Sequence, residues 1–136
     1  MTLVTGTVVG SAGPAAADGA GQCGGTLIDR SVVRYDGAAI GELVVYYNAS
    51  NGNNCARFNH LGAAYGVERR TVVQLYRCAE RSPADCTPTV LAQEDEAVSF
   101  YAGPVRVYSP ANCVSARGAI QWAGAVRAVS SGTIGC

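Results

Sequence analysis

Short runs of β-branched and aromatic residues alternate along the chain with clusters of glycine, asparagine, aspartate and proline. Runs of about four to eight such residues favour β-strands, because these side chains pack well on a pleated surface, and the clusters favour turns. Helical periodicity is almost absent. The pattern therefore predicts an all-β fold, either a single antiparallel sandwich or a small closed barrel of short strands.

The first three predicted strands form a meander over Val32 to Tyr35, Glu42 to Asn48 and Cys55 to His60. Asp36-Gly37 lies in the first turn and Asn51-Gly52 in the second. Asn-Gly adopts positive φ at low cost, so Asn51-Gly52 is the strongest hairpin signal in the chain.

Seven further strands are predicted downstream, with turn residues between them. They cover Thr71 to Cys78, Thr89 to Gln93, Val98 to Tyr101, Val105 to Tyr108, Cys113 to Ala116, Ala119 to Trp122 and Ala125 to Val129. In the strand from Thr71 neither face is fully polar, so we expect it to be covered on both sides. At Glu94-Asp95-Glu96 a short helical turn competes with a strand.

Six cysteines follow a small-residue segment that ends Ala15-Ala16-Ala17-Asp18. This combination is typical of a secreted domain stapled by three disulfides. We therefore divide the chain into residues 1–17, a secretion signal remnant or flexible arm, and residues 18–136, the disulfide-stapled domain. The signal pattern is incomplete, because no basic residue follows Met1.

Charged residues make up only 15% of the chain, with ten acidic against ten basic side chains. A chain without a basic field does not attract nucleic acid, so we expect no nucleic-acid partner. No apolar run reaches the roughly 18 to 20 residues that span a bilayer, which predicts no transmembrane segment. All ten basic residues are arginine, which fits the coding bias of a GC-rich genome such as that of actinobacteria.

The spacing of the cysteines favours local bridges. Cys78 and Cys86 flank a turn and are predicted to pair with each other. For the remaining four, the sequential pairs Cys23–Cys55 and Cys113–Cys136 have shorter loops than the nested alternative, and the first needs a bend at Cys23. The chain has no Cys-x-x-Cys and no finger-like spacing, so we predict neither a zinc site nor a redox pair, and no cofactor.

Catalytic constellations are not evident. His60 is the only imidazole and has no nucleophile motif beside it, so a structural role is expected. Cys23-Gly24-Gly25-Thr26 is similar to a strand of trypsin-like proteases, but the sequence contexts of their catalytic histidine and serine are missing. The acids Glu94 to Glu96 match no calcium loop. We predict no catalytic and no metal-binding residue; a small hydrolase using His60 or these acids is the least favoured function.

Seven tyrosines and one tryptophan are the remaining unusual feature. Tyrosine pairs a flat apolar ring with a hydroxyl, which suits sugar stacking and protein interfaces alike. If Tyr46, Tyr101, Tyr108 and Trp122 share an exposed face, they form a binding patch for a cell-surface glycan or a protein. Tyr46 and Tyr47 must point to opposite sides of one strand.

The stretch Val44 to Cys55, with Tyr-Asn-x-Ser-x-Gly-x-Asn-Cys in it, resembles the small secreted spore-associated proteins of streptomycetes. Tyr101 to Val105, then Cys113 and a glycine-containing tail ending in cysteine, are similar to that family's next landmarks, so the resemblance covers roughly residues 41–136. The Cys78 to Cys86 loop departs from the pattern.

The resemblance implies a secreted protein of the spore or cell surface without established enzymatic activity. We therefore expect a secreted, non-catalytic structural or binding protein. The alternative is a secreted inhibitor or effector that presents the Cys78–Cys86 loop to a protein partner, because a bridged loop loses less entropy on binding. Exposed strand edges and a nearly neutral surface would also permit self-association.

Overall fold

Eight strands and two short helical turns make up residues 20–136, the part of the chain that the structure, a computed structural model, describes. The elements are α1 (Ala20–Cys23), β1 (Thr26–Tyr35), β2 (Ala38–Asn48), β3 (Asn53–His60), η2 (Gly62–Ala64), β4 (Arg69–Cys78), β5 (Pro88–Val98), β6 (Tyr101–Tyr108), β7 (Val114–Trp122) and β8 (Ala125–Ile134). The arm predicted over residues 1–17 lies outside the described residues.

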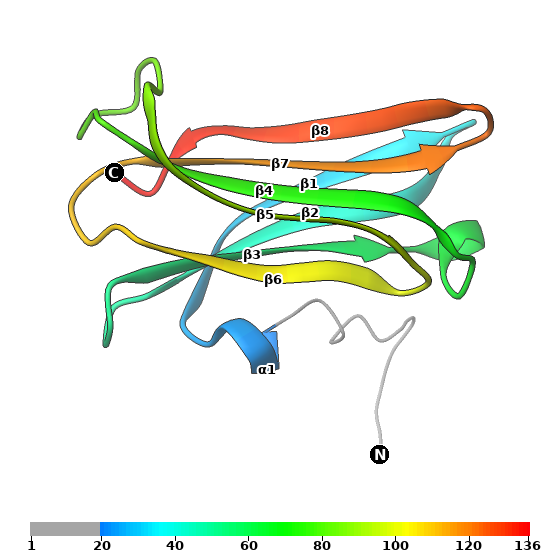
Figure 1. Ribbon diagram of the computed structural model, residues 1–136, viewed down its shortest axis with the longest axis horizontal. Coiled ribbons are helices and arrows are strands. Elements are labelled where there is room, and N and C mark those ends of the chain that lie inside the picture. Colours follow the sequence, from blue (N-terminus) through cyan, green and yellow to red (C-terminus); the bar gives the residue numbers. More distant parts are fainter. Residues whose placement is uncertain (1–19) are drawn as a thin grey trace.

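The strands run along the long axis of the molecule and form two four-stranded sheets (Figure 1). Sheet A has the order β1-β2-β3-β6, and sheet B has the order β5-β4-β7-β8. Every paired neighbour is antiparallel. Each sheet ends in edge strands instead of closing on itself, so of the two predicted architectures the structure is the sandwich. No helix within residues 20–136 is long and apolar enough to cross a membrane.

The tight turns that the sequence predicts are present. Asp36 and Gly37 both have positive φ, 53° and 80°, in the two-residue turn between β1 and β2. The Asn51-Gly52 hairpin is confirmed, although its turn spans residues 49–52 and only Gly52 has positive φ. The Gly52 N–H donates to the carbonyl of Asn48 at 2.8 Å, which closes this turn.

Phe58 of β3 is fully buried at the centre of the core between the sheets. Its ring lies against Gly41 of β2 and Gly118 of β7, one glycine from each sheet. A Cβ at Gly41 would lie 2.5 Å from the ring, and a Cβ at Gly118 would also collide with it. The two glycines therefore make room for the largest side chain of the core, whose burial contributes about 2 to 3 kcal/mol.

Several predicted boundaries are wrong, and packing explains them. The two strands predicted over residues 113–116 and 119–122 are one strand, β7, which begins at Val114. Gly118 makes room for the Phe58 ring and does not end the strand. The acidic residues 94–96 are part of β5, so no helical turn forms there. Residues 98–101 do not form a strand of their own. Val98 ends β5, Tyr101 begins β6, and residues 99–100 between them turn the chain from sheet B to sheet A.

The sequential disulfide set is confirmed, with bridges Cys23–Cys55, Cys78–Cys86 and Cys113–Cys136. The bend expected at Cys23 is made by Gly24 and Gly25, whose φ values of 69° and 78° favour glycine. It brings Cys23 across β2 to Cys55 on β3, so this bridge lies on the outer face of sheet A.

Candidate binding surfaces

The outer face of sheet A carries a polar cluster, which we call the Glu42 network: Glu42, Asn59 and Arg57, which are buried, with Arg30 and Gln22, which are exposed. Both carboxylate oxygens of Glu42 accept hydrogen bonds, from Arg30 Nε at 2.6 Å and from Asn59 Nδ2 at 2.9 Å. Arg57 Nε donates to Asn59 Oδ1 at 2.7 Å, and Arg57 Nη1 donates to Gln22 Oε1 at 2.5 Å. Glu42, Arg57 and Asn59 are each at most 4% exposed. Buried charges are tolerated when they are paired and hydrogen-bonded in this way.

Two of the four aromatic residues proposed for binding belong to this closed face. Tyr46 is 3% exposed and packs with Val44 beside the Cys23–Cys55 bridge. The Tyr101 ring lies under the Arg57 guanidinium, 3.7 Å from Cζ to the ring centroid, in a cation–π contact. Tyr46 and Tyr101 therefore support the fold of this face.

The other two aromatic residues lie far apart. Tyr108 is 60% exposed at the end of β6 in sheet A. Trp122 ends β7 in sheet B and is half-buried, with the Arg69 guanidinium 5.3 Å from its ring centroid. The structure thus does not bring the four predicted residues together on one exposed face.

The outer face of sheet B is open and carries an ordered row of polar side chains. Gln74 Nε2 donates to Gln93 Oε1 at 2.9 Å, and the Tyr76 hydroxyl donates to Gln74 Oε1 at 3.1 Å. We call Gln93, Gln74 and Tyr76 the amide ladder. Thr71, Val73 and Leu75, on the other face of β4, are fully buried, whereas Val72, Gln74 and Tyr76 are only partly buried. The expectation that this strand is covered on both sides is therefore wrong.

One ion pair flanks the amide ladder. Arg70 donates through Nε and Nη2 to the two carboxylate oxygens of Asp95, at 2.9 and 2.8 Å. These hydrogen bonds hold the pKa of Asp95 below its usual value and raise the pKa of Arg70. Asp95 points outward, and the register places Glu94 and Glu96 on the opposite face of β5. The three consecutive acids therefore do not converge on one site.

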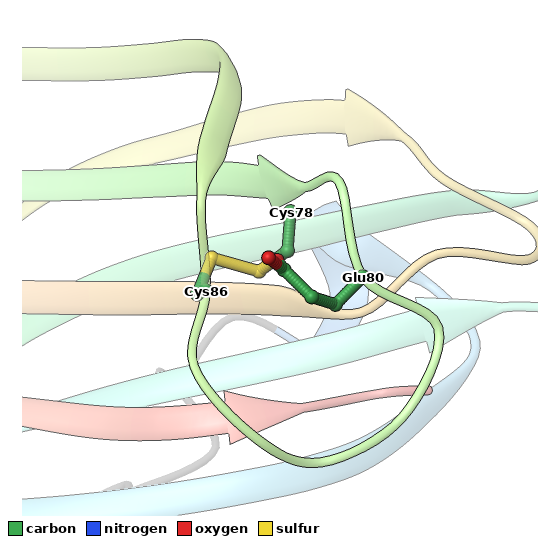
Figure 2. A group of neighbouring side chains, drawn as sticks. All are labelled: Cys78, Glu80 and Cys86. Atoms are coloured by element: carbon green, nitrogen blue, oxygen red, sulfur yellow. A yellow bond between two sulfur atoms is a disulfide. The ribbon is translucent and has the colours of Figure 1, made fainter.

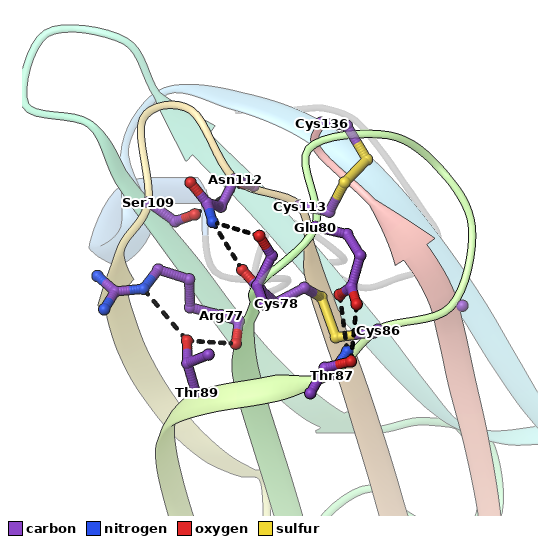
Figure 3. The surroundings of a disulfide bond; sticks show 12 residues. Arg77, Cys78, Glu80, Cys86, Thr87, Thr89, Ser109, Asn112, Cys113 and Cys136 are labelled. Atoms are coloured by element: carbon purple, nitrogen blue, oxygen red, sulfur yellow. Dashed lines mark hydrogen bonds between the residues drawn. A yellow bond between two sulfur atoms is a disulfide. The ribbon is translucent and has the colours of Figure 1, made fainter.

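The Cys78–Cys86 loop is held firmly at its base (Figures 2 and 3). Beside the disulfide, the Glu80 carboxylate accepts hydrogen bonds from the backbone N–H and the hydroxyl of Thr87, both at 2.7 Å. These bonds hold the pKa of Glu80 below its usual value. Asn112 Nδ2 donates to the carbonyls of Cys78 and Ala79, at 2.9 and 3.0 Å.

The second disulfide of this end supports the same loop. The Cys113 N–H donates to the Glu80 carbonyl at 2.9 Å, and Cys113 Sγ lies 3.3 Å from the Ser82 carbonyl oxygen. Cys113 is bonded to Cys136, so its sulfur carries no hydrogen and the second contact is not a hydrogen bond. The tip from Arg81 to Asp85 is exposed. The loop thus presents a short exposed tip on a fixed base.

Cys78, Glu80 and Cys86 lie close enough to suggest a metal site, and Figure 2 shows their side chains together. The two sulfurs are bonded to each other, so neither is a thiolate, the form that binds metal. Both Glu80 oxygens already accept hydrogen bonds from Thr87. The chemistry of this cluster is therefore that of an anchored disulfide loop.

His60 is 1% exposed and lies where the two sheets meet. Its Nδ1 is 3.1 Å from the Ala64 carbonyl oxygen, and its Nε2 is 2.7 Å from Thr71 Oγ1 on β4. Burial lowers the pKa of His60, so the neutral ring is favoured. Thr71 Oγ1 also lies 2.9 Å from the Arg69 carbonyl oxygen, so its single hydroxyl proton serves one of these two contacts. Both nitrogens are engaged, as in a structural histidine.

The sequence did not single out Gln74, Gln93, Arg70 or Arg117, which project from the open face of sheet B. The available signal was the alternation in β4, where Val72, Gln74 and Tyr76 share one face; its polar members marked the open side. No family model, curated protein or solved structure matches this chain significantly.

Proposed function

We propose that this chain is a secreted, non-catalytic binding protein of the cell or spore surface. The observation that carries the proposal is the open outer face of sheet B, where the amide ladder is already ordered by its own hydrogen bonds. Pre-ordered amides and hydroxyls on a rigid sheet bind sugar hydroxyls with little loss of side-chain entropy. Three disulfides suit an oxidising extracellular compartment.

The resemblance to the spore-associated proteins of streptomycetes supports the same location, on the residues from Val44 to Cys55. The surface that we assign differs from the one that the aromatic residues suggested, because Tyr46 and Tyr101 are committed to the closed face of sheet A. A polar sheet face, and not an aromatic patch, is the binding surface in this proposal.

The test is retention of the refolded protein on washed spore and cell-wall preparations. The variant Gln74→Ala/Gln93→Ala removes the amide ladder and is expected to lose about tenfold in affinity, since several hydrogen bonds to the ligand are lost. Tyr108→Ala, an exposed position on the other sheet, is the control and should bind as the wild type does. Loss of binding in Tyr108→Ala alone would show that the binding surface lies around Tyr108 and not on sheet B.

The second candidate is the inhibitor or effector, favoured by the Cys78–Cys86 loop with its fixed base and exposed tip. Here the partner is a protein that contacts the tip from Arg81 to Asp85. Replacement of these five residues by a glycine-serine segment of equal length leaves the base intact and should abolish capture of that partner. Unchanged capture would exclude the loop.

A further inference from the structure

A shallow depression lies on the outer face of sheet B, beside the amide ladder. Its volume is about 100 Å³. It is lined by Arg70, Val72, Arg117, Ala119, Gln121 and Val126. The depression exists because Val72 and Ala119 are adjacent in the register of β4 and β7, and Ala128 of β8 follows Ala119. Short apolar side chains thus form its floor, with longer polar ones around it.

The two arginines at the rim differ in their electrostatic state. Arg70 is paired through two hydrogen bonds with Asp95, which fixes its guanidinium and compensates its charge. Arg117 is exposed, and within residues 20–136 its side chain makes no hydrogen bond, ion pair or ring contact. Asp95 is the only acid among the outward positions that the register assigns to sheet B, so this face carries a net charge of about +1 centred on Arg117.

We infer that this depression is a subsite for the carboxylate of an acidic saccharide, of the hexuronic acid type. This inference rests on the proposed function, because it assigns the ligand class of the same face. The planar guanidinium of Arg117 matches a carboxylate in geometry and charge. Gln121 and the amide ladder supply donors and acceptors for the hydroxyls of the same sugar chain.

The apolar floor distinguishes this ligand from other anions. A volume of about 100 Å³ holds roughly three waters, which is the space of a carboxylate with part of the ring that bears it. The C–H face of a sugar ring can rest on Val72 and the exposed Val126, above the buried Ala119. A poly(glycerol phosphate) chain has no ring to cover this floor, and so gains only the charge contact. The depression therefore selects a ring-borne carboxylate.

The experiment is calorimetric titration of the refolded protein at low salt with three probes: hexagalacturonate, its carboxyl-reduced form and poly(glycerol phosphate). Hexagalacturonate should bind about tenfold more tightly than either of the others. Binding should move the side-chain Nε–H resonance of Arg117 in nitrogen-15 spectra. Equal binding of the acidic and carboxyl-reduced hexamers would overturn the inference.

Two variants localise the effect. Arg117→Gln removes the uncompensated charge, and Ala119→Leu fills the depression; each should weaken hexagalacturonate binding about tenfold or more. Arg34→Gln makes the same change in net charge at an exposed position on β1 of sheet A and should alter affinity less than twofold. An equal loss in Arg34→Gln would show attraction by net charge alone and overturn the subsite.

The failures of the two proposals are distinguishable. If the protein is retained on cell-wall material but does not prefer hexagalacturonate, the saccharide inference fails and the binding function stands. If it binds neither the cell-wall material nor any of the three probes, both fail.

Discussion

The polar side chains on the outer faces of the two sheets differ in burial and in how many partners they have within the protein. In sheet A, Glu42 and Arg57 are buried and hydrogen-bonded, and the Cys23–Cys55 bridge lies across the same face. In sheet B, Gln74 is only partly buried and Arg117 is exposed. Buried polar groups must find partners within the protein, whereas exposed ones are free to exchange water for a ligand. Sheet A is therefore the structural face, and sheet B is the face available for binding.

The largest expected difference concerns the disulfides. Replacing Cys23 and Cys55 by serine should lower the free energy of unfolding by about 4 kcal/mol, because the bridge closes a loop with a sequence separation of 32. The same change at Cys78 and Cys86, with a separation of 8, should cost about 2.5 kcal/mol. Urea denaturation without reductant measures both. Equal costs would show that the bridge on sheet A is not the principal constraint on the unfolded chain.

A reciprocal pair of substitutions compares the faces directly. Glu42→Gln leaves Arg30 without its carboxylate and should cost about 2 kcal/mol, less than a fully buried pair because the Arg30 side chain is 52% exposed. Gln93→Glu makes the opposite change on sheet B and should cost less than about 0.5 kcal/mol, since the carboxylate still accepts from Gln74. Similar losses in both variants would contradict the distinction between the faces.

The His60–Thr71 hydrogen bond joins the two sheets and should make the free energy of unfolding depend on pH. Because burial lowers the pKa of His60, the unfolded chain binds a proton more readily than the folded one. The free energy of unfolding should therefore fall as pH drops below about 6.5, and level off below the folded pKa.

Denaturation midpoints between pH 7.5 and pH 5 test this effect. His60→Gln should be less stable than the wild type at pH 7.5 and should show almost no change across the range. A slope that persists in the variant would assign the pH dependence to other groups.

The smallest expected effect is at the surface of sheet B. The Arg70 hydrogen bonds lower the pKa of Asp95, so the contribution of this pair is complete above the ordinary carboxyl pKa and is lost as pH falls through the lowered one. In Arg70→Gln the pKa of Asp95 should return toward its ordinary value of about 3.8. Carboxyl-carbon chemical shifts follow the titration. Because the pair is exposed, thermal stability at neutral pH should hardly change.

Much of the fold could be read from local signals. Asp36-Gly37 and Asn51-Gly52 predicted the turns in which they lie, and the short spacing of Cys78 and Cys86 predicted the disulfide between them. The break predicted between two strands near Gly118 was wrong because that glycine makes room for the ring of Phe58, which is distant in sequence. A glycine in the sequence indicates that a strand can end there. Only the contact of Gly118 with Phe58 explains why β7 continues through it.

The binding surface was harder to predict than the fold. Tyr46 and Tyr101 have the chemistry of ligand-binding residues, yet α1 and the Cys23–Cys55 bridge lie on their face of sheet A. Which face stays open depends on where α1 and the Cys23–Cys55 bridge lie, and no sequence motif indicates their position. Arg117 becomes notable only when its lack of a partner within residues 20–136 is known.

The three bridges also determine how the domain would respond to mechanical tension. If the chain is pulled at Cys23 and Cys136, the load passes through Cys23–Cys55 and Cys113–Cys136 and leaves both enclosed segments slack. Only the chain between Cys55 and Cys113 can then extend, and the Cys78–Cys86 bridge shortens even that. A protein held at a surface by one end and loaded at the other would thus extend over somewhat less than half of the distance that the same chain would reach without its bridges.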